Sequence, residues 1–297
     1  MNLRSGLIFA IISPLLNSIA TILKGVAVKS LGPLAVLSFG SLLGAGILIF
    51  YSLLRKQKFS LNNLKDNSKD FFLLILTRPI LGDLLFVFGL ASTLGIKAIF
   101  LTKIEPYFVL FWHWILRKEK VTSSQLILLS IHIGGAVILS TGGNFTGIKN
   151  AQIGDLLIIL AMGLFSLSYF PAKKVAIKIG ATQTNGLMLL VSGLFFLPFV
   201  FLFPNSDVFS FFNKGWTYLV LSTIIFTTVG LTLWFASLKS VKSWIVSALR
   251  SLGPIAGLPF AYFLFGEKLS GVQLFGGIIV LSTSFLIAKE HFRKEKN

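Results

Sequence analysis

Five charged residues lie inside long apolar stretches of this 297-residue chain and are the first candidates for chemistry: Arg78, Asp83, Lys103, Glu105 and Arg250. A charge held within hydrocarbon costs several kcal/mol unless it is paired or hydrated, so each such residue marks a functional site by default. A guanidinium binds carboxylate or phosphate groups bidentately. We therefore expect Arg78 or Arg250 to contact an anionic group of a bound ligand, and Asp83 or Glu105 to be candidates for carrying a proton.

The same charges have a second explanation, which is mutual pairing that only stabilises the fold. Two residues five apart on an α-helix point about 140° away from each other, so Arg78 and Asp83 are not expected to pair within one helix. Pairs across helices, Arg78 with Glu105 and Lys103 with Asp83, would leave Arg250 over. The five charges are confined to three of the apolar stretches, which favours one shared polar cavity, but both explanations stay open at this stage.

Uncharged residues add to the candidate site. Polar-tipped side chains within apolar stretches are expected to line the same cavity, namely Asn17, Tyr107, Tyr169 and Trp234. Pro106 and Pro254 each remove a helix hydrogen bond and are predicted to break helices beside the site. No metal, cofactor or catalytic group is expected, because the three histidines are scattered and no Ser-His-Asp set or phosphate-binding loop is legible.

The elements that position these residues follow from the composition. The mean hydropathy is +0.86, and only 12% of residues are charged, against about 25% in soluble domains. A helix needs about 20 apolar residues to cross a bilayer. Ten segments of that length predict an all-α integral membrane protein, at about 5–24, 33–54, 70–91, 96–116, 122–141, 153–174, 183–203, 215–237, 244–265 and 270–288.

The net charge of +17 is read as a topology signal rather than a nucleic-acid site. Ten crossings place both termini on one side of the membrane, and that side carries 18 of the 27 basic residues against 6 on the other. Because cytoplasmic loops collect Lys and Arg, both termini are predicted to be cytoplasmic. The basic tail, His291–Asn297, is then an anchor on that side.

An internal repeat divides the chain. An offset of 148 residues aligns Gly6 with Gly154, Gly32 with Gly180, Ser92 with Ser240, Pro106 with Pro254 and Glu119-Lys120 with Glu267-Lys268. Five spans per copy, 1–148 and 149–297, turn the second copy upside down relative to the first. Inverted repeats are typical of secondary transporters, in which the two halves rock around a site near the bilayer midplane.

The motifs at the ends of the two copies resemble a known family. Glu105-Pro106, Arg117-Lys118-Glu119-Lys120, Gln125 and Gly134-Gly135 resemble the end of an EamA-type repeat, and Gly253-Pro254, Gly266-Glu267-Lys268-Leu269-Ser270, Gln273 and Gly276-Gly277 repeat the pattern. EamA domains belong to the drug/metabolite transporter superfamily. The resemblance implies ten helices in two five-helix repeats, and export or import of amino acids, nucleotide sugars, cofactors or drugs.

The sequence therefore predicts a secondary transporter that moves a small organic metabolite by alternating access. Export of amino acids or related metabolites across a bacterial cytoplasmic membrane is the first expectation, and uptake of an anionic or zwitterionic nutrient or cofactor is the alternative. An integral-membrane enzyme acting on lipid or polyprenyl substrates is the alternative of another class. The expected partners are the small-molecule substrate and membrane lipid, without nucleic acid, in a monomer or weak homodimer.

Overall fold

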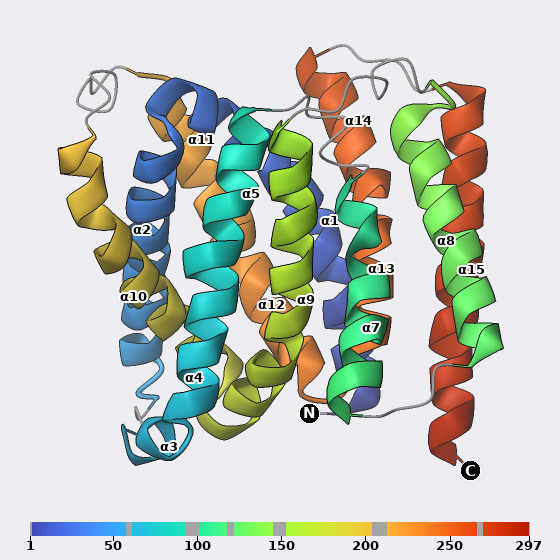
Figure 1. Ribbon diagram of the computed structural model, residues 1–297, viewed down its shortest axis with the longest axis horizontal. Helices are drawn as coiled ribbons and strands as arrows, with labels where there is room; N and C mark the ends of the chain where they lie inside the picture. Colours follow the sequence, from blue (N-terminus) through green and yellow to red (C-terminus); the bar gives the residue numbers. More distant parts are fainter. Residues whose placement is uncertain are drawn as a thin grey trace.

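A computed structural model describes residues 2–57, 61–92, 101–117, 122–144, 153–203, 213–265 and 270–296, and within these ranges the chain is helical (Figure 1). The first half contains α1 (Leu3–Leu31), α2 (Pro33–Leu54), α3 (Leu61–Asp66), α4 (Ser68–Ile75), η1 (Leu76–Ile80), α5 (Leu81–Ala91), η2 (Thr102–Ile104), α7 (Glu105–Arg117) and α8 (Ser123–Thr141). The second half contains α9 (Ile153–Ile179), α10 (Ala181–Leu202), α11 (Gly215–Ser222), η5 (Thr223–Gly230), α12 (Leu231–Leu238), α13 (Ser243–Leu249), η6 (Arg250–Leu252), α14 (Gly253–Phe265) and α15 (Gly271–Lys296).

Six helical runs in the described chain are long and apolar enough to cross a membrane: Leu3–Leu31, Pro33–Leu54, Ser68–Ala91, Ile153–Ile179, Ala181–Leu202 and Gly215–Leu238. Large apolar side chains cover the outside of the bundle, with Leu54 67% and Phe263 82% exposed. An apolar exterior of this extent is the surface of a membrane protein. Of the four remaining predicted spans, two fall on α8 and α15, whose described apolar stretches, Leu126–Leu139 and Gly271–Thr283, are shorter than a membrane crossing, and two fall on the helices interrupted at η2 and η6, so the count of ten crossings stays a prediction.

The first predicted span is too short. It was placed at residues 5–24, whereas α1 runs from Leu3 to Leu31. The Oδ1 atom of Asn2 accepts a hydrogen bond from the Ser5 backbone N–H at 2.9 Å and begins the helix. Gly32, with φ of 83°, ends it, because glycine adopts this left-handed conformation without steric cost. Lys24 is consequently part of a membrane helix and not of an external loop.

The repeat of 148 residues is visible in backbone conformation and in packing. Gly180, the counterpart of Gly32, joins α9 to α10 with φ of 93°. A Cβ atom on Gly6 would meet the Ser240 side chain, and one on Gly154 would lie 2.8 Å from the Ser92 carbonyl carbon. Each contact joins one repeat to the other, and the two contacts are exchanged by the repeat operation. Figure 1 shows α1 and α9 starting at opposite ends of the bundle.

Helix irregularities also occur in equivalent pairs. The 3₁₀ segment Thr102–Ile104 corresponds residue for residue to Arg250–Leu252, and each ends just before a proline-bearing helix. A proline at position i offers no N–H to the carbonyl of residue i−4 and clashes with it. For Pro106 this is the carbonyl of Thr102, and for Pro254 it is the carbonyl of Arg250. The α-helical pattern is interrupted at these two residues. These breaks lie in the two places the sequence predicts.

Two segments of π-helix form a second pair, η1 in the first repeat and η5 in the second. Pro79 explains η1, because it lacks an N–H for the Ile75 carbonyl. No proline lies in η5. There the side-chain amide of Asn185, on α10, donates to the carbonyls of Thr227 at 2.8 Å and Thr228 at 3.4 Å, which stabilises the wider turn.

The helices of the two repeats interlock. In the packing, α1 lies against α11, η5, α12 and α14 of the second repeat, and α9 lies against α4, α5 and α7 of the first. Helix pairs α2–α10 and α8–α15 form the two lateral edges of the bundle (Figure 1). A large buried core, including Tyr169, Trp234 and Ile245, fills the part of the interior nearer the termini. The site described next lies on the other side of that core.

Candidate functional site

A cavity of about 100 Å³ lies within the bundle, between elements of both repeats. Its walls come from α1, the η1–α5 run and the η2–α7 junction, together with α9, the α11–η5 run and the α13–α14 junction. The lining residues lie from the middle of the bundle toward the end opposite the termini. The predicted site residues Asn17, Arg78, Asp83, Glu105, Pro106 and Arg250 all line this cavity.

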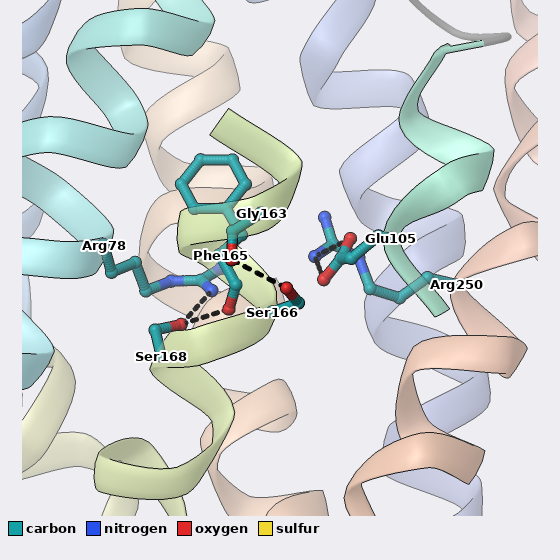
Figure 2. Close-up of polar contacts among 7 residues, drawn as sticks. All are labelled: Arg78, Glu105, Gly163, Phe165, Ser166, Ser168 and Arg250. Atoms are coloured by element: carbon teal, nitrogen blue, oxygen red, sulfur yellow. Dashed lines mark hydrogen bonds and ion pairs between the residues drawn. The ribbon is translucent and has the colours of Figure 1, made fainter. Parts of the chain in front are cut away.

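The Arg78 side chain is 5% exposed and points from η1 toward α9. Its Nη1 atom donates to the Ser168 hydroxyl at 3.4 Å (Figure 2). The guanidinium carbon also lies 4.1 Å from the centre of the Trp234 ring and 5.2 Å from that of Phe165. Cation–π contacts of this kind hold a guanidinium in place without neutralising its charge.

Arg78 and Asp83 line the same cavity although an ordinary α-helix would point them apart. The η1 segment accounts for this, because the Leu81 N–H bonds the Leu76 carbonyl five residues back. Hydrogen bonds of this i→i+5 type bring residues five apart close to one face. Arg78 and Asp83 nevertheless form no ion pair with each other in the described part of the chain.

Arg250 forms an ion pair with Glu105. The Nη1 atom of Arg250 lies 2.8 Å from Oε1 and 2.7 Å from Oε2 of the carboxylate. The Glu105 side chain is 2% exposed and that of Arg250 is 18% exposed. Figure 2 shows the two side chains pointing toward each other from the η2–α7 and α13–α14 junctions. The pairing of Arg78 with Glu105 considered from sequence is therefore not the one adopted.

Asp83 has no hydrogen bond or ion pair within the described residues, and it faces the cavity beside Lys24. Lys24, Arg78 and Arg250 are the cations whose charge acts on this carboxylate. Among the described side chains, the cavity thus holds three cations and two carboxylates. Two of these five charges, those of Arg250 and Glu105, are already engaged with each other.

Tyr169 and Trp234, which the sequence predicts to line the cavity, are not among its lining residues; they are packed behind its wall, with Trp234 against Arg78. Tyr169 is fully buried and Trp234 is 2% exposed, and their rings meet edge to face with centres 5.0 Å apart. The Tyr169 hydroxyl, the Trp234 indole N–H and the Ser247 hydroxyl are all buried without a hydrogen-bond partner. Ser247 lines the cavity from α13.

The remaining predicted site residues are placed differently. The Tyr107 hydroxyl meets the Ser130 hydroxyl of α8 at 2.9 Å and is not part of the cavity wall. Lys103 lies in the 3₁₀ segment η2, and Pro254 lies in the first turn of α14. The side chains of both fall outside the described part of the chain, as do those of the basic tail.

Three contributors to the site were missed by sequence reasoning. Lys24 was assigned to a loop because α1 was predicted to end there. Ser168 and Ser247 are small polar residues of a kind that occurs throughout the chain, so residue type alone does not distinguish them. Their closeness in sequence to predicted site residues could have pointed to them. Ser168 lies one residue before Tyr169, and Ser247 lies three residues before Arg250.

Comparison with known proteins identifies the family. Two stretches of the chain, residues 4–141 and 152–289, each match the EamA-like transporter family. The chain belongs to this family. The two matches confirm the two-repeat organisation, and the resemblance seen in the glycine, proline and Glu-Lys motifs was correct. The chain is accordingly a multi-pass membrane protein of a transporter family.

Relatives with curated descriptions are also transporters. An uncharacterized transporter of Methanothermobacter thermautotrophicus is 24% identical over 95% of this chain and 85% of its own length. The uncharacterized transporter YetK of Bacillus subtilis is 25% identical over 73% of this chain and 68% of its own. A probable amino-acid metabolite efflux pump of Salmonella typhimurium is 35% identical, but over only 20% of each chain.

The EamA-like architecture also matches a solved structure. A crystal structure superposes on this chain with a TM-score of 0.80, covering 99% of this chain and 100% of the other. The two sequences are 13% identical. At that level of identity the likeness concerns the fold alone.

Proposed function

We propose that this EamA-family protein is a secondary transporter that moves a small organic metabolite by alternating access. The observation that carries the proposal is the charged cavity between the two repeats, enclosed by an otherwise apolar bundle. A cavity at the interface of inverted repeats is the place where such transporters hold their cargo. Its charges cost free energy in a bilayer and serve function only if something polar enters.

The cavity is asymmetric along the bundle, which supports alternating access. Its lining residues lie toward the end opposite the termini, while the core around Tyr169, Trp234 and Ile245 closes the other end. With ten crossings and cytoplasmic termini, this arrangement corresponds to a site that is closed toward the cytoplasm. Transport then requires the packing between α1, α9 and their neighbours to open on the cytoplasmic side.

Export of amino acids or related metabolites from a bacterial cytoplasm is the favoured direction and cargo class. A cavity with both signs of charge suits a cargo bearing an ammonium and a carboxylate, and one partial relative is a probable amino-acid metabolite efflux pump. Uptake of an anionic or zwitterionic nutrient is the alternative in the opposite direction. A lipid-modifying enzyme fits less well, because the charges line a cavity between the two repeats rather than gathering at one face of the membrane. We further propose that the functional unit is a monomer or a weak homodimer.

Reconstitution tests this function. Purified protein is incorporated into liposomes loaded with a mixture of amino acids and their hydroxy-acid analogues, and loss of each compound is followed by mass spectrometry. We expect one chemically related subset to leave faster than from empty liposomes, and to leave faster still when the same compound is supplied outside. Equal loss from both kinds of liposome, for every compound and in both directions, would contradict the proposal.

A further inference from the structure

The most unusual group in the cavity is Arg78, a buried cation that has no carboxylate partner among the described residues. Among the described residues it contacts Ser168, through one long hydrogen bond, and the faces of two aromatic rings. Asp83 acts on Arg78 electrostatically but forms no ion pair with it. A buried charge of this kind is strongly destabilising unless an opposite charge accompanies it. The surroundings of Arg78 therefore favour an anion that binds close to it.

Three unsatisfied hydrogen-bond donors lie close to one another, and one of them, that of Trp234, belongs to a ring in contact with Arg78. The Tyr169 hydroxyl, the Trp234 indole N–H and the Ser247 hydroxyl are each buried and unpaired. Trp234 contacts both Arg78 and Tyr169, with 4.1 Å from its ring centre to the guanidinium carbon and 5.0 Å to the phenol ring. An indole N–H can only donate, and an unmet buried donor costs about 1–3 kcal/mol. One unpaired donor is unusual, and three close together indicate a missing acceptor.

The three donors converge without satisfying one another. Trp234, Ser247 and Arg250 lie near enough to the Tyr169 oxygen to act on it, but no pair among Tyr169, Trp234 and Ser247 has the distance and angles of a hydrogen bond. Closeness alone does not make a hydrogen bond, which requires both a short distance and alignment. The three groups thus lie close together around the Tyr169 hydroxyl, unbonded to one another, and Ser247 brings this cluster to the cavity wall.

The net charge of the cavity and the forked shape of the guanidinium favour a carboxylate as the ligand. Arg250 is neutralised by Glu105, and the other charged residues that line the described part of the cavity, Lys24, Arg78 and Asp83, sum to one positive charge. A monoanion balances this charge, whereas a phosphate dianion exceeds it. A carboxylate also presents two oxygens, which matches the fork of a guanidinium.

We infer that Arg78 and Ser247, which line the cavity, form a carboxylate-binding subsite together with Trp234 and Tyr169, which are packed beside them behind the wall. In transport, which this inference takes from the proposed function, the carboxylate of the cargo occupies the subsite, with its oxygens accepting from Arg78, Tyr169, Ser247 and the Trp234 indole. The rest of the cargo then extends past Asp83 toward Asn17 and Lys24 on α1. A free inorganic anion such as chloride is the other possible occupant of the same donors.

Acetate is the minimal probe for this subsite. The purified full-length protein in detergent is titrated with sodium acetate, and binding is followed by saturation transfer from protein to the acetate methyl protons. We expect saturable binding of acetate, weaker binding of neutral acetamide, and no displacement of acetate by an equal concentration of chloride. Removing a hydrogen bond to a charged group costs about 1.5–3 kcal/mol, so Tyr169→Phe and Ser247→Ala should each weaken acetate binding about tenfold or more.

Tyr107→Phe is the matched control, because its hydroxyl is bonded to Ser130 outside the cavity. It should leave acetate binding unchanged, while Arg78→Gln should abolish it. Thermal unfolding of each variant establishes that it is folded, and Ser247→Ala, which removes one oxygen, keeps the test decisive if Arg78→Gln does not fold. Equal binding of acetate and acetamide, displacement by chloride, or equal affinity in the wild type, Tyr169→Phe and Ser247→Ala proteins would each overturn the carboxylate assignment.

The binding measurement needs no membrane and no gradient, so it is independent of the transport assay. Acetate binding that depends on Tyr169 and Ser247, in a protein without flux, would support the subsite and contradict the proposed function. Flux by a protein that fails to bind acetate would support the proposed function and contradict the subsite.

Discussion

Arg250 contacts both carboxylate oxygens of Glu105 through its Nη1 atom, at 2.8 and 2.7 Å. Glu105 begins α7 of the first repeat, and Arg250 begins η6 of the second. Their counterparts 148 residues away are Gly253 and Thr102, neither of which is charged. The ion pair therefore breaks the symmetry of the two repeats and ties one to the other beside the cavity. Movement of the repeats relative to each other must preserve, stretch or replace this contact.

Removing one member of this pair should destabilise the protein strongly. Glu105→Gln leaves the Arg250 guanidinium without its counter-charge, and Arg250→Gln leaves the more deeply buried Glu105 unpaired. Breaking a buried pair costs about 3–5 kcal/mol, so the temperature of unfolding of the purified protein should fall in both variants. The double variant should lose less than either single change, because no unpaired charge remains.

Asp70→Asn serves as the control for the ion-pair variants. Asp70 pairs with Lys174 at 3.0 Å, but these side chains are 28% and 56% exposed. Exposed pairs contribute about 0–1 kcal/mol, so this change should barely alter the unfolding temperature. If Glu105→Gln is as mild as Asp70→Asn, the pair is solvated and does not hold the repeats together.

The positions of the helices were largely predictable, because apolar length and an internal repeat are both visible in the sequence. Their irregular turns were only partly predictable. Pro106 and Pro254 located the 3₁₀ breaks, since a missing N–H acts on a fixed carbonyl four residues back. The π-helical segment η5 has no proline and depends on Asn185 of another helix. The residues of η5 alone therefore do not predict its irregular turn.

The cavity residues were identified by type, but their contacts were not. A buried charge can be read from the sequence, whereas its partner depends on how α7 and α13–α14 cross. Arg250 thus pairs with Glu105 although Arg78 was the partner considered. Tyr107 illustrates the same limit. It lies two residues after Glu105, but the rotation of α7 directs its hydroxyl to Ser130 rather than to the cavity.

Glycines in α8 and α15 should tolerate substitution very unequally. A Cβ on Gly276 would meet the backbone of Leu139 and the Gly135 carbonyl oxygen, and one on Gly135 would meet Ile279. Overpacking typically costs about 1–3 kcal/mol, so Gly276→Ala and Gly135→Ala should lower the unfolding temperature. Their direct neighbours are matched controls.

A Cβ on Gly134 has no atom within 4 Å, and one on Gly277 makes an ordinary contact at 3.6 Å with Leu139. Alanine also favours helix over glycine by about 0.5–1 kcal/mol. Gly134→Ala and Gly277→Ala should therefore be neutral or slightly stabilising. Similar losses at all four positions would show that α8 and α15 do not pack in this register.

Asp83 should select for an amino group on the cargo. Its carboxylate faces the cavity without an ion-pair partner among the described residues, so a cargo ammonium near it gains a charge-assisted hydrogen bond. In liposomes, Asp83→Asn should reduce exchange of a transported amino acid about tenfold. The change should affect the matching hydroxy acid much less. Asp70→Asn should change neither rate, and an equal loss for both compounds in Asp83→Asn would rule out ammonium recognition there.

The orientation of the protein can be tested directly, because the chain has no cysteine. Gln57 and Asn144 are neutral, exposed residues after α2 and α8, at opposite ends of the bundle (Figure 1). With cytoplasmic termini, a membrane-impermeant maleimide should label Asn144→Cys in intact cells and Gln57→Cys only after the cells are opened. Substituting these two residues leaves the basic residues that set topology unchanged. The reverse pattern of labelling would place the termini outside, and the cavity of this structure would then face away from the outside of the cell.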